Sequence, residues 1–350
     1  MAKLSTLETD SPATVAAGAA LWAKGFKNEL INGCFRLWWR GISLPAATGV
    51  RYLADRWFTS ATGSTAAPSL QQFAFGQTVV PGSPRYFHRV VVSSVAGASN
   101  SVSLSQFIED VERFSGRTVM VSFWAKADAA RSIAVEMVQS FGGGGSPSAP
   151  VLGIGATKIA LSTSWAKYAV PVTLPSVAGK ILGTYDDATA LNFWMDAGSA
   201  LNSRTGTLGQ QSGTFDFACV QLETGRVDTV FERRPIGLEY QMALRYALLL
   251  KAAVPYQFFA NGYVANSTQT NNFFSLPAPM RKQPAVSFGG PLSVVSNGVF
   301  SPVSTLTVQA TANTNGVTAT IGSGSLTPNV PSILASNNST DTFVLFDAEF

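Results

Sequence analysis

Apolar and polar residues alternate one by one along two neighbouring stretches of residues 116–145. One face of the first stretch would carry Val119, Val121, Phe123 and Ala125, and one face of the second would carry Ile133, Val135 and Met137. Alternation with a period of two, rich in β-branched and aromatic residues, is typical of strands that bury one face. The glycine run at residues 142–145 would end the second strand. Because an isolated strand pair is only marginally stable in water, the pattern predicts a hairpin that further strands must cover.

Further strands with the same alternation are predicted on both sides of this hairpin. They cover residues 86–92, 165–174, 191–195 and 215–221, and an opening strand would place Phe35, Leu37 and Trp39 on one face. One helix is expected among them, over residues 105–114, because Phe107, Val111 and Phe114 recur at helical spacing. Many short strands separated by turn signals favour a mainly β fold, a two-sheet sandwich over residues 30–233.

A linking helix is predicted over residues 234–252, after the sandwich. Pro235 would stand in its first turn, where a missing N–H costs nothing. Its apolar stripe would consist of Leu238, Met242, Tyr246, Leu249 and Leu250. The pattern then returns to strands, which predicts a C-terminal antiparallel β-domain over residues 253–350. Within it, residues 294–304 and 322–339 are rich in Ser, Thr, Asn and Gly, a composition typical of flexible loops or of exposed, trimer-stabilised β-structure in fibre-like proteins.

The first residues differ from the rest of the chain. Residues 14–27 are rich in alanine and predict a short helix, weakened by Gly18 and Gly25. Its apolar residues are too few for a domain. Residues 1–29 are therefore interpreted either as an arm that docks on the virion or on a neighbouring subunit, or as a helix lying across its own sandwich.

Charge is sparse, and this narrows the choice of partners. Charged residues make up 13% of the chain, about half of the usual ~25%. This indicates either an uncharged polar surface or a surface buried against other subunits. The net charge is +4, but Lys and Arg are scattered rather than gathered in a stripe, so no nucleic-acid partner is predicted. No apolar run of about 18 residues occurs and no secretory signal is evident, so no membrane span is predicted.

The 2 cysteines, Cys34 and Cys219, are too few for a disulfide scaffold or a zinc site. Each falls in a predicted strand, which favours two small buried side chains. Cys34 would lie in the first strand of the sandwich and Cys219 in the last, so the two could be neighbours. Whether they approach each other stays open at this stage.

Residues for catalysis are scarce. The single histidine, His88, lies in an alternating strand without the serine or cysteine partner that a catalytic base would need, which favours a structural role. Carboxylates that could pair for glycan hydrolysis are Glu136, Asp186, Asp187, Asp216 and Glu223. The adjacent Asp186 and Asp187 are typical of a turn, and the alternative is a calcium ligand pair. The glycine-rich loops lack nucleotide-binding context. No catalytic residue, cofactor or metal is predicted.

Several segments together carry a family resemblance. They are NELINGCFRLWWRG, GRTVMVSFWAKA, SFGGGGSPS, WAKYAVPVTLPSVAGKILGT, FERRPIGLEYQMALRYALLL and LPAPMRKQPAVSF. In this order, over residues 28–290, they resemble a β-sandwich module common in tailed-bacteriophage structural proteins. The chain departs from the family pattern in the helix, where Ala243 stands for a usual cysteine and Ala247 for a tyrosine.

The resemblance implies a jelly roll like those of carbohydrate-binding modules, in a non-enzymatic virion protein. Such a protein would be a compact tail fibre, head fibre or decoration protein, a homotrimer in contact with other virion proteins and able to meet a host-surface glycan. Its cysteines would stay free thiols, because virions assemble in reducing cytoplasm. The alternatives are a host-glycan-binding lectin and, less favoured, a polysaccharide depolymerase.

Aromatic residues offer the candidate contact sites. Trp124 and Trp194 are out of phase with the apolar face of their strands, so both are expected on the outer face of the sandwich. A solvent-facing tryptophan can stack on a sugar ring or fill a subunit interface. Enrichment of aromatic residues at interfaces favours the trimer contact.

Overall fold

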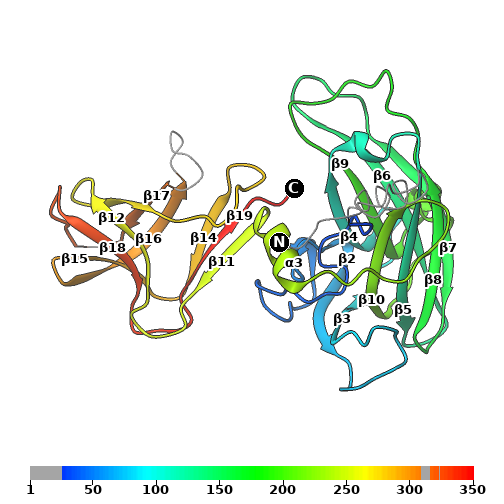
Figure 1. Ribbon diagram of the computed structural model, residues 1–350, viewed down its shortest axis with the longest axis horizontal. Helices are drawn as coiled ribbons and strands as arrows, with labels where there is room; N and C mark the ends of the chain where they lie inside the picture. The colour runs from blue at the N-terminus through cyan, green and yellow to red at the C-terminus, as the bar shows by residue number, and fades with distance from the viewer. Residues whose placement is uncertain (1–25, 309–315, 323) are drawn as a thin grey trace, which may run out of the picture.

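The computed structural model describes residues 26–308, 316–322 and 324–350, and most of its regular structure is β-strand. Figure 1 shows two parts joined end to end, with helix α3 (Ile236–Leu244) and the C-terminus where they meet. The larger part is a jelly-roll sandwich and the smaller an antiparallel β-structure, so the predicted fold class is confirmed. Residues 1–25 of the expected N-terminal arm lie outside the described residues. Among the described residues, no helix has both the length and the apolar character needed to cross a membrane.

The jelly roll is a 10-stranded sheet bent into two layers. Its strands are β1 (Ala47–Tyr52), β2 (Phe58–Gln72), β3 (Tyr86–Ser93), β4 (Ser101–Glu109), β5 (Thr118–Ala127), β6 (Arg131–Gly143), β7 (Val151–Leu161), β8 (Ala166–Thr173), β9 (Tyr185–Ala197) and β10 (Gly213–Thr224). They follow the order β7-β6-β9-β4-β2-β3-β10-β5-β8, with β1 attached to β2. Strand β2 belongs to both layers, because residues 58–62 pair with β4 and residues 65–72 pair with β3. Gly63, with a φ of 67°, lies between these halves and lets the strand change direction.

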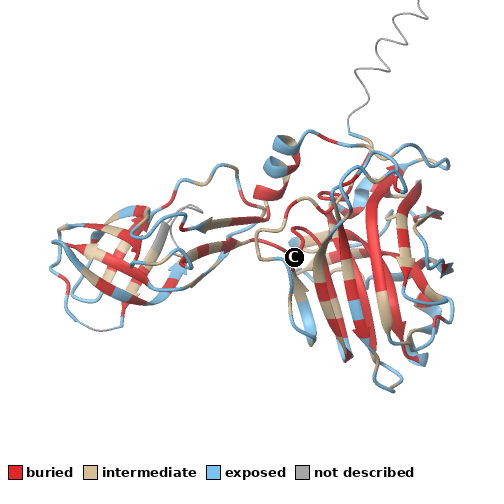
Figure 2. Cartoon of the chain, turned by 90° about the horizontal axis from the view of Figure 1, so that it is seen from below, coloured by how far each residue is buried: buried red, intermediate tan, exposed pale blue. Residues whose placement is uncertain are grey.

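The core of the sandwich lies between its two layers, as the buried inner positions in Figure 2 show. Phe193 stands in its middle, with ring centroids 4.8 Å from Phe123, 5.2 Å from Phe217 and 6.4 Å from Trp57. The predicted inner faces of residues 116–145 are confirmed, since all of their apolar residues belong to this core. The outer ends of the sheet also approach each other: a Cβ on Gly155 of β7 would lie 2.6 Å from the Val172 side chain of β8.

The hairpin prediction for residues 116–145 is wrong in its pairing. Strands β5 and β6 follow each other directly, but β5 pairs with β8 and β10, whereas β6 pairs with β7 and β9. Residues 128–130 therefore cross from one layer to the other. Alternation identifies which face of a strand is buried, but it does not identify the neighbouring strand.

The helix predicted over residues 105–114 is also wrong. Strand β4 continues to Glu109, and only a 3₁₀ turn, η1 (Val111–Phe114), follows it. Val102, Leu104 and Ile108 enter the core at strand spacing. Because β4 pairs with both β2 and β9, its backbone hydrogen bonds are made on two sides. These strand pairings decide the structure here, despite the helical spacing of Phe107, Val111 and Phe114.

The opening strand expected around Phe35 is a buried loop instead. Asn32 organises it: its side-chain oxygen accepts bonds from the N–H groups of Arg36 (2.7 Å) and Leu37 (3.0 Å). Its amide nitrogen donates to the carbonyl oxygen of Asp55 at 3.0 Å. Phe35 and Leu37 are buried as expected, but Cys34 lies in this loop rather than in a strand.

The linking helix is shorter than predicted. It ends at Leu244, and residues 247–251 form strand β11 (Ala247–Lys251). The reason is that Leu248 and Leu250 pair with β19 (Phe343–Asp347), opposite Phe346 and Val344. Leu250, which fits the predicted helical stripe, therefore also fits one side of a sheet together with Leu248, which lies outside that stripe.

The smaller part consists of a three-stranded sheet and a closed barrel. The sheet has the order β11-β19-β14, with β14 (Ala285–Gly289). The barrel strands are β12 (Phe258–Val264), β13 (Gln269–Phe273), β15 (Leu292–Ser296), β16 (Val299–Val308), β17 (Gly316–Ile321) and β18 (Pro331–Ser336). Strands β15, β16 and β18 lie within or across the Ser/Thr/Asn/Gly-rich segments, and Val294 and Leu334 there are completely buried. The β-structure expected in these segments is therefore confirmed for those strands, although these two residues are buried rather than exposed, and stabilisation by a trimer stays a prediction.

Buried ion pairs join the two parts. Arg56 of the jelly roll, 1% exposed, pairs with Glu349 near the C-terminus, and its guanidinium lies 3.4 Å from the Tyr246 ring centre. Arg40 bridges Asp55 of the jelly roll and Asp347 of β19, at 3.1 Å each. A buried guanidinium is costly unless a carboxylate lies in good geometry beside it, so these contacts favour one orientation of the two parts.

Candidate functional site

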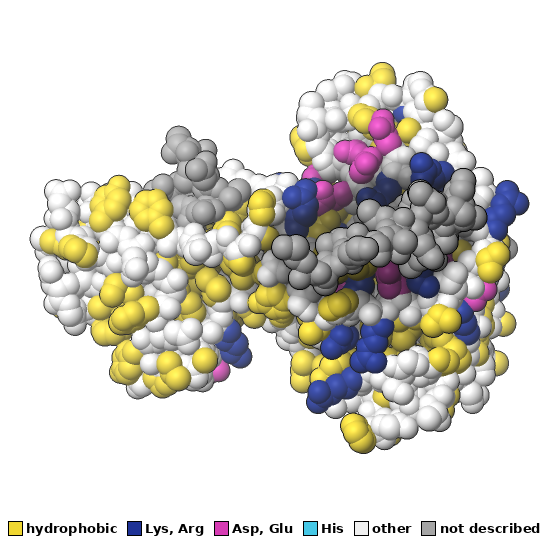
Figure 3. All heavy atoms as spheres, viewed as in Figure 1, with side chains coloured by type: hydrophobic (Ala, Val, Ile, Leu, Met, Phe, Trp, Pro, Cys, Tyr) yellow, Lys and Arg dark blue, Asp and Glu magenta, His cyan; other side chains and the backbone are white. Residues whose placement is uncertain are grey.

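A cleft of about 500 Å³ opens where the jelly roll meets the smaller part. It is lined by Glu109, Asp110, Glu112, Leu182, Thr184, Tyr185, Asp186, Asp187, Arg245, Arg281 and Lys282. These residues come from the end of β4, from η1, from the start of β9, from the end of α3 and from the loop between β13 and β14. Figure 3 shows acidic side chains next to basic ones close to where the two parts meet. The volume suits a small polar ligand of a few rings.

Tyr185 forms an aromatic platform at the rim of this cleft. Its ring lies against the glycine run: a Cβ on Gly143 would lie 2.7 Å from the ring, and one on Gly144 would lie 3.1 Å from it. A larger residue at either position would push the ring away, so the packing of Tyr185 explains why glycines stand there. The tyrosine remains 61% exposed, so part of its ring is open to solvent.

The basic side chains of the cleft are already paired. Arg245 binds Glu109 through two contacts of 2.8 and 2.7 Å. Burial of Glu109 opposes its ionisation, but hydrogen bonds from Arg245 and Tyr246 outweigh it, so the pKa of Glu109 lies below its usual value. Arg281 pairs with Asp186 at the opposite side of the cleft. These pairs hold the walls in place rather than leaving free cations for a ligand.

Three acidic groups keep unused acceptors in the cleft. Asp187 accepts the N–H of Val111 at 3.0 Å with one oxygen, and Asp110 accepts the N–H of Glu112 at 3.0 Å with one oxygen. Within the described ranges, the second oxygen of each of these carboxylates and both oxygens of the Glu112 side chain have no hydrogen-bond partner in the protein. An aromatic face beside free carboxylate oxygens is the set of groups that binds a sugar, whose ring has apolar C–H faces and hydroxyl donors.

The other carboxylates considered for hydrolysis are engaged in the fold. Asp216 binds Arg89 through contacts of 2.7 and 2.8 Å. Glu223 accepts the N–H and the hydroxyl of Thr229, at 2.9 and 2.8 Å. Glu136 is completely buried under Arg204, which contacts it at 2.7 and 3.0 Å. These contacts explain the acids as structural groups.

Calcium gains no support at the Asp186–Asp187 pair. Asp186 is neutralised by Arg281 and lies 3.8 Å from the Lys282 ammonium. Asp187 accepts the N–H of Val111 with one oxygen and has only its second oxygen left as a possible ligand. Nowhere in the described ranges do three or more His, Cys, Asp or Glu side chains gather as metal ligands.

The two tryptophans have different surroundings. Trp194 lies outside the central core, as expected, but only 7% of it is exposed. Its indole N–H donates to Glu136 at 2.8 Å, and the guanidinium of Arg204 lies 4.9 Å from its ring centre. It has no open face for a sugar or a subunit in this arrangement. Trp124 is half-buried on β5, opposite Lys167 of β8, and its contact role stays a prediction.

His88 is a buried structural residue. It is 1% exposed, and its ring stacks on Trp38 with centroids 5.2 Å apart. Burial lowers the pKa of His88 to about 3. In the unfolded chain a histidine has a pKa of about 6.5. Between these two pKa values the histidine is protonated in the unfolded chain and neutral in the folded chain.

The folded protein is therefore expected to lose stability as the pH falls below about 6.5, by about 2.5 kcal/mol between pH 6.5 and pH 4.5 from His88 alone. Urea unfolding at these two pH values measures the loss. The variant His88→Phe keeps an aromatic ring and removes the titration, so its loss should be smaller by about that amount. An equal loss in both proteins would contradict the assignment.

Sequence reasoning missed Tyr185. It precedes the aspartates in a stretch that is typical of a turn, and it starts β9, where alternation has not yet begun. The available signal was indirect: four successive glycines at residues 142–145 leave a bare backbone on which another ring can lie.

No family model matches the sequence, and no curated protein matches it. Among solved structures, the enzymatically active domain of tailspike protein 4 from bacteriophage CBA120 has a TM-score of 0.35 at 15% identity, over 57% of this chain and 21% of that one. A putative sugar binding protein from Bacteroides thetaiotaomicron has a TM-score of 0.35 at 15% identity, over 57% of this chain and 100% of that one. The family 11 carbohydrate-binding module of a Clostridium thermocellum cellulase has a TM-score of 0.32 at 15% identity, over 53% and 99%. This chain thus spans about a fifth of the tailspike structure, and scores of this size say nothing about what the chain binds.

Proposed function

We propose that this protein binds a glycan in the cleft between the jelly roll and the smaller part. The observation that supports this most is Tyr185, whose ring is held against the glycine run and remains 61% exposed beside a cleft of about 500 Å³. One sugar ring would stack on the tyrosine. Its hydroxyls would donate to the free oxygens of Asp110, Glu112 and Asp187.

The proposed role is binding without hydrolysis. A glycosidase needs one carboxyl group that holds a proton and a second that acts as nucleophile or base. In the cleft, Glu109 and Asp186 are each paired with an arginine, and the hydrogen bonds that lower the pKa of Glu109 oppose its holding a proton. The depolymerase alternative would require release of reducing ends from a polysaccharide.

A Tyr185→Ala variant is expected to weaken glycan binding by about 10- to 100-fold, because it removes the apolar area that the tyrosine ring and a stacked sugar would bury against each other. A glycan array with the full chain identifies the ligand, and calorimetry with the best-bound oligosaccharide measures the affinity. Gly143→Ala should weaken binding while keeping the tyrosine, because its Cβ would displace the ring.

The matched control is Tyr263→Ala, on β12 of the barrel, where a tyrosine is 45% exposed and does not line the cleft. The affinity for the glycan should be unchanged in the Tyr263→Ala variant. Equal affinity of the Tyr185→Ala variant and the unchanged protein would refute the cleft as the glycan site.

We also propose that the chain is a structural component of a tailed-phage virion, as a homotrimeric compact fibre or decoration protein with the arm, jelly roll, linker and β-domain as its units. The sequence resemblance over residues 28–290 supports this, and the buried ionic junction suits a part that must keep its shape. Native mass spectrometry of the purified chain and of dissociated particles tests it. A stable monomer that is missing from particles would contradict the assembly role and leave the cleft proposal standing.

A further inference from the structure

The two cysteines of the chain lie together, although they are 185 residues apart in sequence. The sulfur of Cys34, in the loop before β1, is 3.5 Å from the sulfur of Cys219 in β10, and both are unbonded thiols. Two thiols at this distance need only a small approach to reach the ~2.05 Å of a disulfide.

The backbone on both sides of this pair is held close. The N–H of Val220 donates to the carbonyl oxygen of Gly33 at 2.8 Å, so the residues next to the two cysteines are already bonded to each other. Gly33 permits this contact, because a Cβ there would lie 2.2 Å from the Val220 oxygen. Strand β10 is also irregular at this point: its register against β5 shifts between Ala218 and Gln221. The cysteines are thus paired by the fold and not by chance approach of mobile loops.

The two thiols differ in access and reactivity. Cys34 is half-buried and Cys219 is 4% exposed. The hydrogen bond from Cys219 lowers the pKa of Cys34, and the guanidinium groups of Arg233 and Arg36 act in the same direction. A hollow of about 10 Å³, the size of a single water, lies beside Cys34. A small oxidant can reach Cys34, whereas Cys219 is shielded behind it.

We propose that Cys34 and Cys219 form an oxidation site, in which a hydroperoxide converts the two thiols to a disulfide. The Cys34 thiolate attacks one oxygen of the peroxide and breaks the O–O bond, which gives a sulfenic acid and releases hydroxide, protonated to water (an alcohol from an organic peroxide). The Cys219 sulfur then attacks the Cys34 sulfur, loses its proton, and expels the hydroxyl group as a second water. Two thiols are oxidised by two electrons, and one peroxide is reduced.

The disulfide would lock the buried loop that follows the N-terminal residues onto β10. A disulfide that closes a long loop, here of 185 residues, removes more conformational entropy from the unfolded chain than one that closes a short loop. The oxidised form would thus be more stable than the reduced form.

The test treats the full chain with hydrogen peroxide and then counts thiols by maleimide labelling and intact mass. Both thiols should disappear with a mass decrease of about 2 Da, and a peptide linking the two cysteines should appear. The midpoint of thermal unfolding should rise by about 5 °C or more and return to its starting value after reduction.

Two variants separate the steps. In Cys219→Ser, Cys34 should gain oxygen and form no link, and in Cys34→Ser the remaining Cys219 should stay unreacted at the same peroxide concentration. Retention of both thiols in the unchanged protein, addition of oxygen without a link, or an unchanged unfolding midpoint of the linked form would each overturn the proposal.

Discussion

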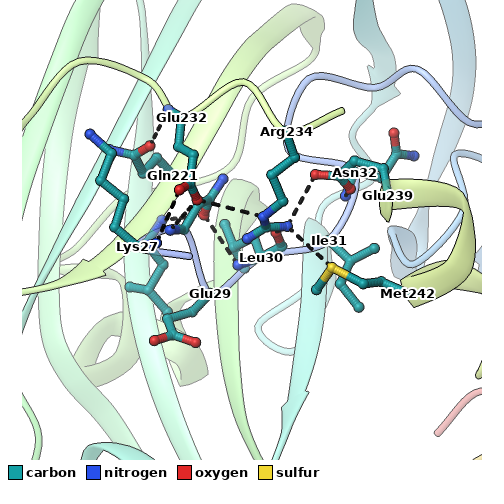
Figure 4. A network of polar contacts seen from close by, with 12 residues as sticks. Lys27, Glu29, Leu30, Ile31, Asn32, Gln221, Glu232, Arg234, Glu239 and Met242 are labelled. Atoms are coloured by element: carbon teal, nitrogen blue, oxygen red, sulfur yellow. Dashed lines mark hydrogen bonds and ion pairs between the residues drawn. The ribbon is translucent and has the colours of Figure 1, made fainter. Parts of the chain in front are cut away.

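Replacing Arg234 with alanine is expected to lower the free energy of unfolding by about 3–5 kcal/mol, the loss typical of a broken buried ion pair. Figure 4 shows Arg234 between the N-terminal loop and α3. Its side chain, 1% exposed, contacts the Leu30 carbonyl oxygen and the Glu239 carboxylate, both at 3.0 Å. Glu239 in turn accepts the N–H of Asn32 at 2.7 Å. The variant leaves this carboxylate buried and without its cation. Urea unfolding measures the loss.

The neighbouring arginine is the control. Arg233 belongs to the same ERRP segment but is exposed, with a contact to the Gly82 carbonyl oxygen at 2.9 Å. Arg233→Ala should change stability by less than about 0.5 kcal/mol. If the two variants were equally stable, the network in Figure 4 would not be what holds the loop.

The second large effect is expected at the junction of the two parts. Glu349→Ala should cost about 3–5 kcal/mol, because it leaves the buried guanidinium of Arg56 without its anion. Arg40 loses a partner as well, since it lies 3.7 Å from Glu349. Differential scanning calorimetry would show the loss, and limited proteolysis would show whether the two parts separate.

The double variant Arg56→Met/Glu349→Met removes both charges. Its loss should be smaller than that of Glu349→Ala alone, because no unpaired charge remains in the junction from this pair. A double variant that is less stable than the single one would mean that the contact acts through packing, such as that of Arg56 on Tyr246, rather than through charge.

The buried faces of the strands could be predicted from the sequence, whereas the partners of the strands could not. Val121 and Val135 both lie in the core, as predicted from the alternation of apolar and polar residues along their strands. Alternation is local information, and the pairing of β5 with β8 and β10 is decided by residues far along the chain. This is why the predicted hairpin was wrong while its faces were confirmed.

Helix and strand were confused where apolar residues fit both periods. Phe107 and Val111 stand four apart, as do Tyr246 and Leu250, yet Phe107 lies in β4, paired with β9, and Leu250 lies in β11, paired with β19. The site was harder still. Glu109, Tyr185 and Arg281 come from separate elements of the two parts, and no spacing in the sequence brings them together.

The place of β19 in the small sheet has a consequence for biosynthesis. This strand, at residues 343–347, lies between β11 and β14, so neither of them has its sheet partner until it has been made. While the ribosome is still translating, β11 and β14 expose open edges able to pair with strands of other nascent chains. Assembly of the three-stranded sheet must therefore wait until residues 343–347 have been made, and a stalled or truncated product that lacks them would be prone to aggregate.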